Sequence, residues 1–184
     1  FKYEVCFLNM SLLDSYGNIN QEEKKNKKYK ISYQILNSFE GGSAASMAKS
    51  IGSAISSLVD FFKSNEFDWI LLAGDRGEQL AAAIAASYMY IPVAHIQSGE
   101  VSGNIDGMTR HAITKLAHLH FASNSDAANR VKRMGEQKFR VHNVGAPQLD
   151  DLYKSKKNFN INFFNKNMRT NFQKEKFAIC VFHG

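Results

Sequence analysis

Short apolar runs alternate with helix-like segments along most of the chain, and this alternation limits the fold more than any other feature of the sequence. Runs at residues 69–73, 92–96, 119–122 and 139–144 are each bounded by turn residues and predict strands. Segments with apolar residues at helical spacing separate these runs. Strands and helices that alternate in this way fold through right-handed crossovers into a parallel sheet flanked by helices. The sequence therefore predicts an α/β fold.

Two further strands are predicted before this series, at residues 3–8 and 31–36. The polar segment 9–30 between them is typical of a long loop. Ser43 suits the N-cap of the next helix, in which apolar residues recur at helical spacing over 47–62.

The two ends of the chain have the pattern of a piece of a longer protein. Phe1 opens directly into a strand-like alternation, and a fresh apolar run at 177–182 stops just before the last residues. We expect residues 1–153 to form a first domain, 154–174 a linker, and 175–184 the start of a second domain.

Composition and charge exclude several classes of protein. Hydrophobic residues make up 44% of the chain, which is enough for a folded core. Much of the net charge of +6 lies in two Asn/Lys-rich stretches without a stacking platform, which favours solvated loops over a nucleic-acid surface. No apolar run is long enough to cross a membrane. Without a CxxC pair, Cys6 and Cys180 are expected to be buried free thiols in the reducing cytoplasm.

Polar side chains follow three of the predicted strands, at the edge where parallel sheets bind their ligands. The first group is the turn that contains Asp75, Arg76 and Glu78. Asp75 could be a plain helix N-cap with Glu78 as its capping-box partner. The same helix start would also favour a bound anion such as a phosphate.

The second group lies in the loop that starts at His95 and contains Gln97, Glu100 and Ser102. Its glycines would let backbone amides approach a ligand. For His95, the sequence alone gives equal weight to a core histidine and to a ligand contact.

The third group is Asp106, Arg110 and His111 on the following helix. Asp106 and Arg110 are four residues apart and share a helix face, which is typical of a surface ion pair and also suits a substrate-binding rim. The residues of this helix that we expect to face the core are Ile105, Ala112, Ile113 and Leu116. His118 and His120 lack an evident third ligand, so no metal site is expected.

Three motifs within residues 74–150 resemble the UDP-N-acetylglucosamine 2-epimerase family, and its hydrolysing branch in particular. They are GDR at 74–76, HIQSGEVSGNID at 95–106 and RHAITKLAHLHF at 110–121, in this order. The resemblance implies two Rossmann-like domains that face each other across a cleft in the GT-B arrangement. This chain would supply most of the N-terminal domain, without its first strand.

The resemblance also implies a reaction. In this family a base removes the C2 proton of the sugar while UDP leaves from C1, and in the hydrolysing branch water then adds with inversion at C2. The implied substrate is a UDP-sugar, and the implied product is a free N-acetylmannosamine-type sugar for a sialic- or legionaminic-acid-like compound. The resemblance implies no cofactor and no metal, and a homodimer or higher homo-oligomer.

Matched to the family motifs, Asp75, Asp106 and His183 fall on catalytic positions. Relatives often carry an acid/base Glu where this chain has Gln97, which cannot ionise. Either Glu100 shares the proton-transfer role, or Asp75 and Asp106 carry it, and we favour the second. The substrate-binding residues that we expect are Arg76, His95, Gln97, Ser102, Arg110 and His111.

Two other functions stay open at this point. A glycosyltransferase with the GT-B arrangement is one, although the pairing of the SGxxD and RHAITK motifs argues against it. A non-enzymatic half-domain is the other, because a fragment would supply only one wall of the cleft. The sequence does not separate UDP-N-acetylglucosamine from a UDP-linked 2,4-diacetamido sugar as the substrate.

Overall fold

The computed structural model describes residues 2–14, 31–35, 43–156, 160–168, 171 and 180. The chain divides into two compact units, Phe1–Gly145 and Ala146–Gly184, and each is described by itself. The first unit contains both sheets and every loop of the predicted site.

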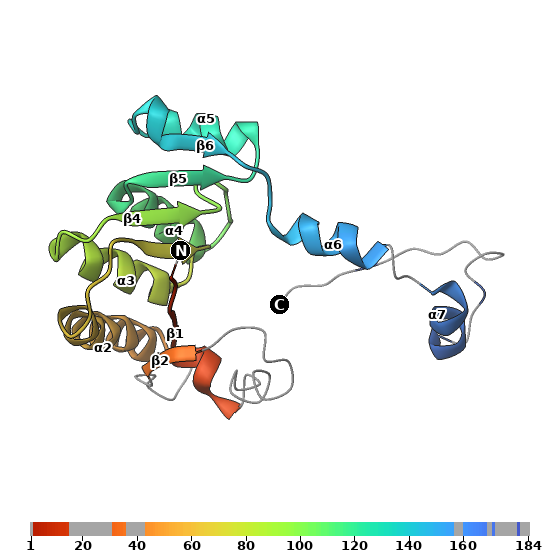
Figure 1. Cartoon of the computed structure of the whole chain (residues 1–184), viewed down its shortest axis with the longest axis horizontal. Coiled ribbons are helices and arrows are strands. Elements are labelled where there is room, and N and C mark those ends of the chain that lie inside the picture. The colour runs from red at the N-terminus through yellow and green to blue at the C-terminus, as the bar shows by residue number, and fades with distance from the viewer. Residues whose placement is uncertain are drawn as a thin grey trace. The chain divides into compact units, whose positions relative to one another are not determined.

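A four-stranded parallel sheet forms the centre of the first unit (Figure 1). Its strands follow one another in chain order, as β3 (Ile70–Ala73), β4 (Val93–Ile96), β5 (Leu119–Ala122) and β6 (Val141–Asn143). The connecting helices are α3 (Gly77–Tyr88), α4 (Ile105–Leu116) and α5 (Ser125–Arg133), with the short 3-10 turn η3 (Lys138–Arg140) before β6. Since successive strands are neighbours, right-handed crossovers place these helices on one face of the sheet. The predicted α/β class with a parallel sheet and flanking helices is confirmed.

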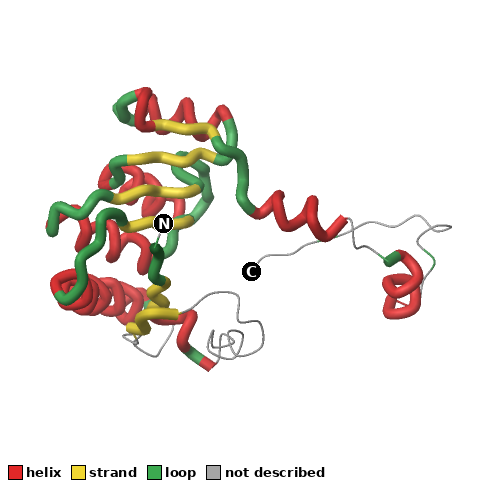
Figure 2. The backbone as a smooth tube through the Cα atoms, in the orientation of Figure 1, coloured by secondary structure: helices red, strands yellow, loops and turns green. Residues whose placement is uncertain are grey.

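A second parallel pair, β1 (Val5–Leu8) and β2 (Ile31–Ile35), forms a separate small sheet. The 3-10 helix η1 (Asn9–Leu12) follows β1. The long helix α2 (Ala44–Lys63) begins at Ser43, whose hydroxyl accepts a hydrogen bond from the Ser46 amide, so the predicted N-cap is confirmed. Helix α2 packs against α3, and Figure 2 shows the two helices side by side.

One row of side chains crosses the central sheet beneath the helices. Leu72, His95, His120 and Val141 lie in register on the four neighbouring strands. Both histidines have no exposed surface, and the two apolar residues are also buried. Two imidazole rings therefore occupy the middle of a core row in which aliphatic side chains would be usual.

Helix α4 differs from the sequence expectation in the face that it buries. Ile105 is 58% exposed and Ala112 is also exposed, whereas Arg110 and Thr114 are buried. The prediction that Ile105 and Ala112 face the core is therefore wrong, although Ile113 is fully buried as expected. The helix turns its polar side toward the loops at the end of the sheet, because Arg110 finds its partners there.

The second unit contains α6 (Gln148–Lys156) and α7 (Ile161–Met168). Helix α7 lies within residues 154–174, where the sequence predicts a linker. Most of the strand expected at 177–182 lies outside the described residues. Among the described residues, none of the helices is long and apolar enough to span a bilayer.

The two predicted free thiols differ in their surroundings. Cys6 and Cys180 are both free, which confirms that part of the expectation. Cys6 is half-buried on β1, and burial raises the pKa of its thiol to about 11. Cys180 is exposed, so the expectation that it is buried is wrong. The apolar run around Cys180 in the sequence was therefore not a sufficient sign of burial.

Two glycines predict opposite effects of the same substitution. Gly99 has φ +80°, and a Cβ there would lie 2.3 Å from the Ala127 carbonyl oxygen on α5. Gly99→Ala should therefore lower the free energy of unfolding by about 1–3 kcal/mol. Gly52 lies within α2, where a Cβ would meet nothing within 4 Å. Gly52→Ala should raise the free energy of unfolding by about 0.5–1 kcal/mol.

Urea unfolding followed by circular dichroism measures both effects. If Gly99→Ala were as stable as the wild type, the loop between β4 and α4 would not lie as close to α5 as the structure shows. Gly103→Ala is the matched control in the same loop, because a Cβ at Gly103 meets nothing within 4 Å.

Candidate active site

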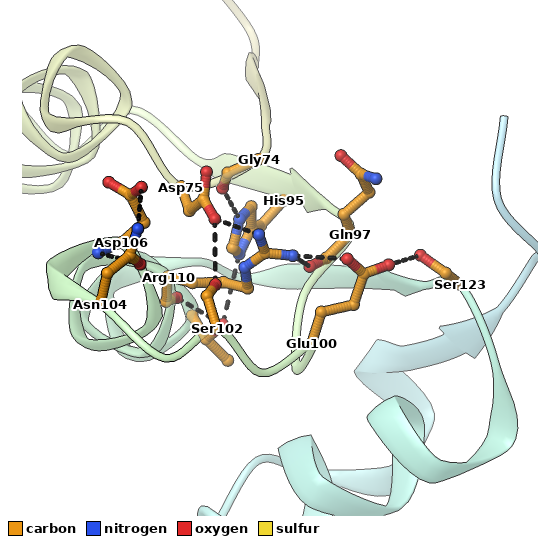
Figure 3. Close-up of polar contacts among 11 residues, drawn as sticks. Gly74, Asp75, His95, Gln97, Glu100, Ser102, Asn104, Asp106, Arg110 and Ser123 are labelled. Carbon is orange, nitrogen blue, oxygen red and sulfur yellow. Dashed lines mark hydrogen bonds and ion pairs between the residues drawn. The ribbon is translucent and has the colours of Figure 1, made fainter. Parts of the chain in front are cut away.

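The predicted polar residues gather at the carboxyl edge of the central sheet, where β3, β4 and β5 end (Figure 3). This is the edge at which parallel α/β sheets bind ligands. Three loops meet there: the turn from β3 to α3, the loop from β4 to α4, and the turn from β5 to α5.

Arg110 lies at the centre of this group. Only 7% of the residue is exposed, and its guanidinium forms ion pairs with Asp75 and Glu100. The Arg110 Nη1–Glu100 Oε2 distance is 2.7 Å, and the same nitrogen donates to the Gln97 carbonyl oxygen at 3.2 Å. Arg110 Nη2 donates to Asp75 Oδ2. A side chain of α4 therefore joins the turn after β3 to the loop after β4.

The two carboxylates that contact Arg110 differ in how many of their oxygens are used. Glu100 accepts from Arg110 on Oε2 and from the Ser123 hydroxyl on Oε1. Asp75 accepts from both Arg110 and the Ser102 hydroxyl on Oδ2, the latter at 3.5 Å. Figure 3 shows the other oxygen of Asp75 pointing away from Arg110. Within the described part of the chain, Asp75 thus keeps one oxygen without a hydrogen bond, whereas both oxygens of Glu100 are engaged.

The start of α3 decides between the two interpretations of Asp75. Arg76 occupies the N-cap position, and its side chain makes no capping hydrogen bond. Asp75 is therefore not the helix cap, and its carboxylate is directed to Arg110 and Ser102. Arg76 is exposed, and with Glu78 it borders a hollow of about 280 Å³ that Cys6 and Leu8 of β1 also line. An exposed arginine at a helix start beside a hollow is well placed for an anionic ligand.

His95 is a fully buried member of the site. Its Nε2 donates to the Gly74 carbonyl oxygen at 2.8 Å, and its Nδ1 lies 3.3 Å from the Thr114 hydroxyl. Burial is the main cause that lowers the pKa of His95 from 6.5 to about 4, so the ring is neutral at physiological pH. His95 therefore fixes the position of the turn before Asp75 from beneath.

Gln97 combines an unusual backbone with a free side chain. It has φ 61°, which is uncommon for a residue other than glycine. Its amide donates to Phe121 O at 2.8 Å, and its carbonyl accepts from Arg110, so the backbone is held on both sides. In Figure 3 the Gln97 side chain points away from the Arg110 cluster. The side-chain amide group, unlike the backbone N–H, has no hydrogen bond to the described residues. Backbone strain of this kind often accompanies a functional position.

Asp106 lies at the start of α4, apart from Arg110. Asn104 caps the helix, accepting from the Asp106 amide at 3.1 Å and donating to Asp106 Oδ2 at 3.0 Å. No Asp106–Arg110 ion pair occurs, because Arg110 pairs with Asp75 and Glu100 instead. Asp106 is half-buried in the first helical turn, where the helix dipole favours a negative charge. His111 is also half-buried, and its Nδ1 has no hydrogen-bond partner among the described residues.

His118 and His120 have structural surroundings. His118 Nδ1 accepts from the Val93 amide at 3.2 Å. The Nε2 of buried His120 lies 3.4 Å from a carboxylate oxygen of Glu136, and burial is the main cause that lowers the His120 pKa. Within the described ranges, no group of three or more His, Cys, Asp or Glu residues could hold a metal.

The structure places three further residues in the site that the sequence analysis did not indicate. Ser123, Asn104 and Thr114 each make a contact that positions a site residue. Ser123 could have been found from the sequence, because it directly follows β5 at the ligand-binding edge. His183 lies outside the described residues, so its catalytic role stays a prediction.

The fold and the site together define a Rossmann-like α/β protein with a carboxylate–arginine cluster at the ligand-binding edge of its sheet. The family described as UDP-N-acetylglucosamine 2-epimerase matches residues 1–184, and the chain belongs to this family. The resemblance stated from the three motifs is thereby confirmed.

Individual relatives agree with this assignment. The chain is 40% identical over 177 residues to a UDP-N,N'-diacetylbacillosamine 2-epimerase (hydrolyzing) of Legionella pneumophila, an alignment of 96% of this chain and 46% of that protein. It is 32% identical to a UDP-N-acetylglucosamine 2-epimerase of Neisseria meningitidis serogroup B, over 79% of this chain and 38% of that protein. The chain thus spans less than half the length of these curated relatives.

Solved structures show the same fold. A UDP-GlcNAc 2-epimerase from Neisseria meningitidis bound to UDP-GlcNAc superposes with a TM-score of 0.69 at 21% identity, covering 95% of this chain and 54% of that one. A UDP-GlcNAc 2-epimerase from Methanocaldococcus jannaschii, in complex with UDP-GlcNAc and UDP, gives a TM-score of 0.68 at 18% identity over 90% and 54% of the two chains.

Because His95 is buried and neutral, we predict that the free energy of unfolding falls in mild acid. Because its pKa is lowered in the folded state, the unfolded state binds more protons between pH 6.5 and about 4. The contribution of neutral His95 to the free energy of unfolding is therefore complete above pH 6.5. It is lost as the pH falls toward 4, by an amount on the order of 3 kcal/mol. His95→Gln should flatten this dependence without abolishing it, since the pKa of His120 is also lowered.

Thermal unfolding at a series of pH values between 7 and about 4 measures this dependence. Exposed His142 supplies the control, because His142→Gln should leave the pH dependence of the melting temperature as in the wild type. An equally steep dependence in His95→Gln would show that His95 is not a neutral buried ring.

Proposed function

We propose that the protein containing this chain is a hydrolysing UDP-N-acetylhexosamine 2-epimerase. One observation carries the proposal: Asp75 is held through Oδ2 by Arg110 and Ser102, while its other oxygen faces away from them at the ligand-binding edge. A carboxylate held in this way can take a proton from a substrate carbon. Family membership supplies the reaction class in which such a proton is removed.

The proposed reaction has two steps. Asp75 takes the proton from C2 of the sugar, the C2–H electron pair forms a double bond to C1, and UDP leaves from C1 with the C1–O electron pair. Water then adds across the double bond, with its hydroxyl on C1 and a proton on the opposite face of C2. Free 2-epimer and UDP are released.

Inversion at C2 requires a second proton-transfer group on the other face of the sugar, and Asp106 is the proposed group. It is half-buried and accepts on Oδ2 from Asn104, which orients it. Glu100 is less suitable, because its two oxygens are engaged by Arg110 and Ser123. This contrast favours Asp75 and Asp106 over Glu100 for the proton transfers.

The remaining site residues are proposed to bind the substrate. Arg76 is exposed beside a hollow at the start of α3 and suits the phosphates of UDP. The free amide of Gln97, together with Ser102 and His111, suits the sugar hydroxyls and its acetamido group. His183 is kept as a catalytic candidate from the family motif. The proposal includes no cofactor and no metal.

The sugar is proposed to be a UDP-linked 2-acetamido hexose. The Legionella pneumophila relative, which aligns with 96% of this chain, acts by its name on UDP-N,N'-diacetylbacillosamine. A diacetamido sugar on the way to a legionaminic-acid-like compound is therefore the first substrate to test, and UDP-N-acetylglucosamine is the second. A homo-oligomer and a cytoplasmic location complete the proposal, the latter supported by the free cysteines.

Product analysis in heavy water tests the reaction. The full-length protein is incubated with each UDP-sugar in turn, and proton NMR follows the sugar. Free 2-epimer with deuterium at C2 and an equal amount of UDP is the expected result for one of the two substrates. Unchanged UDP-sugar in both samples, from folded protein, would favour a glycosyltransferase or a binding module.

Substitutions test the assignment of the proton-transfer groups. Asp75→Asn and Asp106→Asn should each lower kcat by at least about 100-fold, because each removes a carboxylate that transfers a proton. Gln97→Ala should keep turnover within about tenfold of wild type, since only a neutral hydrogen bond is lost. The measurement is UDP release at saturating substrate. A dead Gln97→Ala that still binds the UDP-sugar would contradict the assignment.

A further inference from the structure

The guanidinium of Arg110 is committed to the protein itself. Only 7% of the residue is exposed, Nη1 contacts Glu100 and the Gln97 carbonyl, and Nη2 contacts Asp75. Both terminal nitrogens thus have internal partners. The remaining guanidinium nitrogen, Nε, is buried and has no hydrogen-bond partner among the described residues.

We propose that Arg110 is a positioning residue, which sets the orientation of the Asp75 carboxylate and is itself anchored by Glu100 and Ser123. This proposal rests on the function proposed above for Asp75. It gives Arg110 and Glu100 a role different from substrate binding or proton transfer, and it adds Ser123 as the outer end of a chain of contacts.

The chain of contacts runs through three loops. The Ser123 hydroxyl, just after β5, donates to Glu100 Oε1, and Glu100 Oε2 accepts from Arg110 Nη1. Arg110 Nη2 then donates to Asp75 Oδ2 in the turn after β3. Figure 3 shows these side chains following one another from Ser123 to Asp75. Each link fixes the next, so a change at Ser123 acts on Asp75 without touching it.

The shape of the guanidinium matters to this arrangement as much as its charge. Its two terminal nitrogens diverge from one planar group, so that one side chain reaches a carboxylate on each side. A lysine ammonium is a compact point charge and cannot hold both carboxylates in the same relative orientation. The Arg110→Lys substitution keeps the positive charge but loses the two-sided hydrogen bonding of the guanidinium. It therefore tests the geometry of the side chain separately from its charge.

A second arginine supplies a matched control. Arg130 on α5 donates to the Gly99 carbonyl oxygen at 2.6 Å and pairs with Asp126 at 2.7 Å. It braces the same loop as Arg110 but has no contact with Asp75. If Arg110 only stabilised the loop, Arg110→Lys and Arg130→Lys would have comparable effects on turnover.

Steady-state kinetics of the full-length protein tests the proposal. Arg110→Lys should lower kcat about 100-fold with KM close to the wild-type value, because a misplaced base slows the chemical step and not binding. Ser123→Ala should show the same pattern with a smaller loss, about tenfold. Arg130→Lys should keep the wild-type kcat. Melting temperatures confirm that each variant is folded, and Ser123→Ala decides the matter if Arg110→Lys does not fold.

Three outcomes would overturn the proposal. A raised KM with an unchanged kcat in Arg110→Lys would make Arg110 a substrate ligand. An equal loss of kcat in Arg130→Lys would reduce the role to general bracing of the loop. A wild-type kcat in Ser123→Ala would break the chain of contacts at its outer end.

A crystal structure of the Ser123→Ala protein tests the same link without turnover. The Asp75 carboxylate should rotate or take alternate conformers while the backbone of the three loops stays in place. An unmoved Asp75 would overturn the role of Ser123 as the outer end of this chain of contacts. If wild-type protein converts neither UDP-sugar, only the proposed function is contradicted. The crystal structure of Ser123→Ala tests the positioning of Asp75 separately, so the two failures can be distinguished.

Discussion

The ion pairs of one buried arginine are the interaction on which the site depends. Arg110 comes from α4, and its two carboxylate partners come from the loops after β3 and β4. A charge with so little exposure is stable only when it is paired, and removing one partner of a buried pair costs about 3–5 kcal/mol. The three segments are therefore held to one geometry, because any of them that moved away would leave a buried charge unpaired.

The sheet beneath the site supports this geometry from below. His95 and His120 lie side by side in the row under the helices, and burial lowers the pKa of both rings. His95 donates to the Gly74 carbonyl and faces Thr114, which is on the same helix as Arg110. A leucine in place of His95 would fill the core but would leave the Gly74 carbonyl without this donor. Buried polar residues here fix the position of a turn, which an apolar core alone would not do.

The sequence sufficed for the α/β class, for the four helices α2 to α5 and for the gathering of the site at one sheet edge, because periodicity and turn residues are local signals. It failed on side-chain direction. Helical spacing predicts that Asp106 and Arg110 meet, yet Arg110 pairs with Asp75 and Glu100, which lie in two other loops. Because Arg110 pairs with these carboxylates, the polar side of α4 is buried and Ile105 is exposed. The role of Ser123 depends on a contact across 23 residues, which no local pattern encodes.

The charges of the cluster have a consequence for how a substrate lies. With both carboxylates ionised, Asp75 and Glu100 outweigh Arg110 by one negative charge. A diphosphate placed next to this cluster would be repelled, since Coulomb forces are strong where water is scarce. In the proposed reaction, the nucleotide end would lie toward the exposed Arg76 and the uncharged sugar ring over Asp75. The electrostatic field of the site would thus orient an asymmetric ligand before any specific hydrogen bond forms, and would help to expel a dianionic leaving group away from the base.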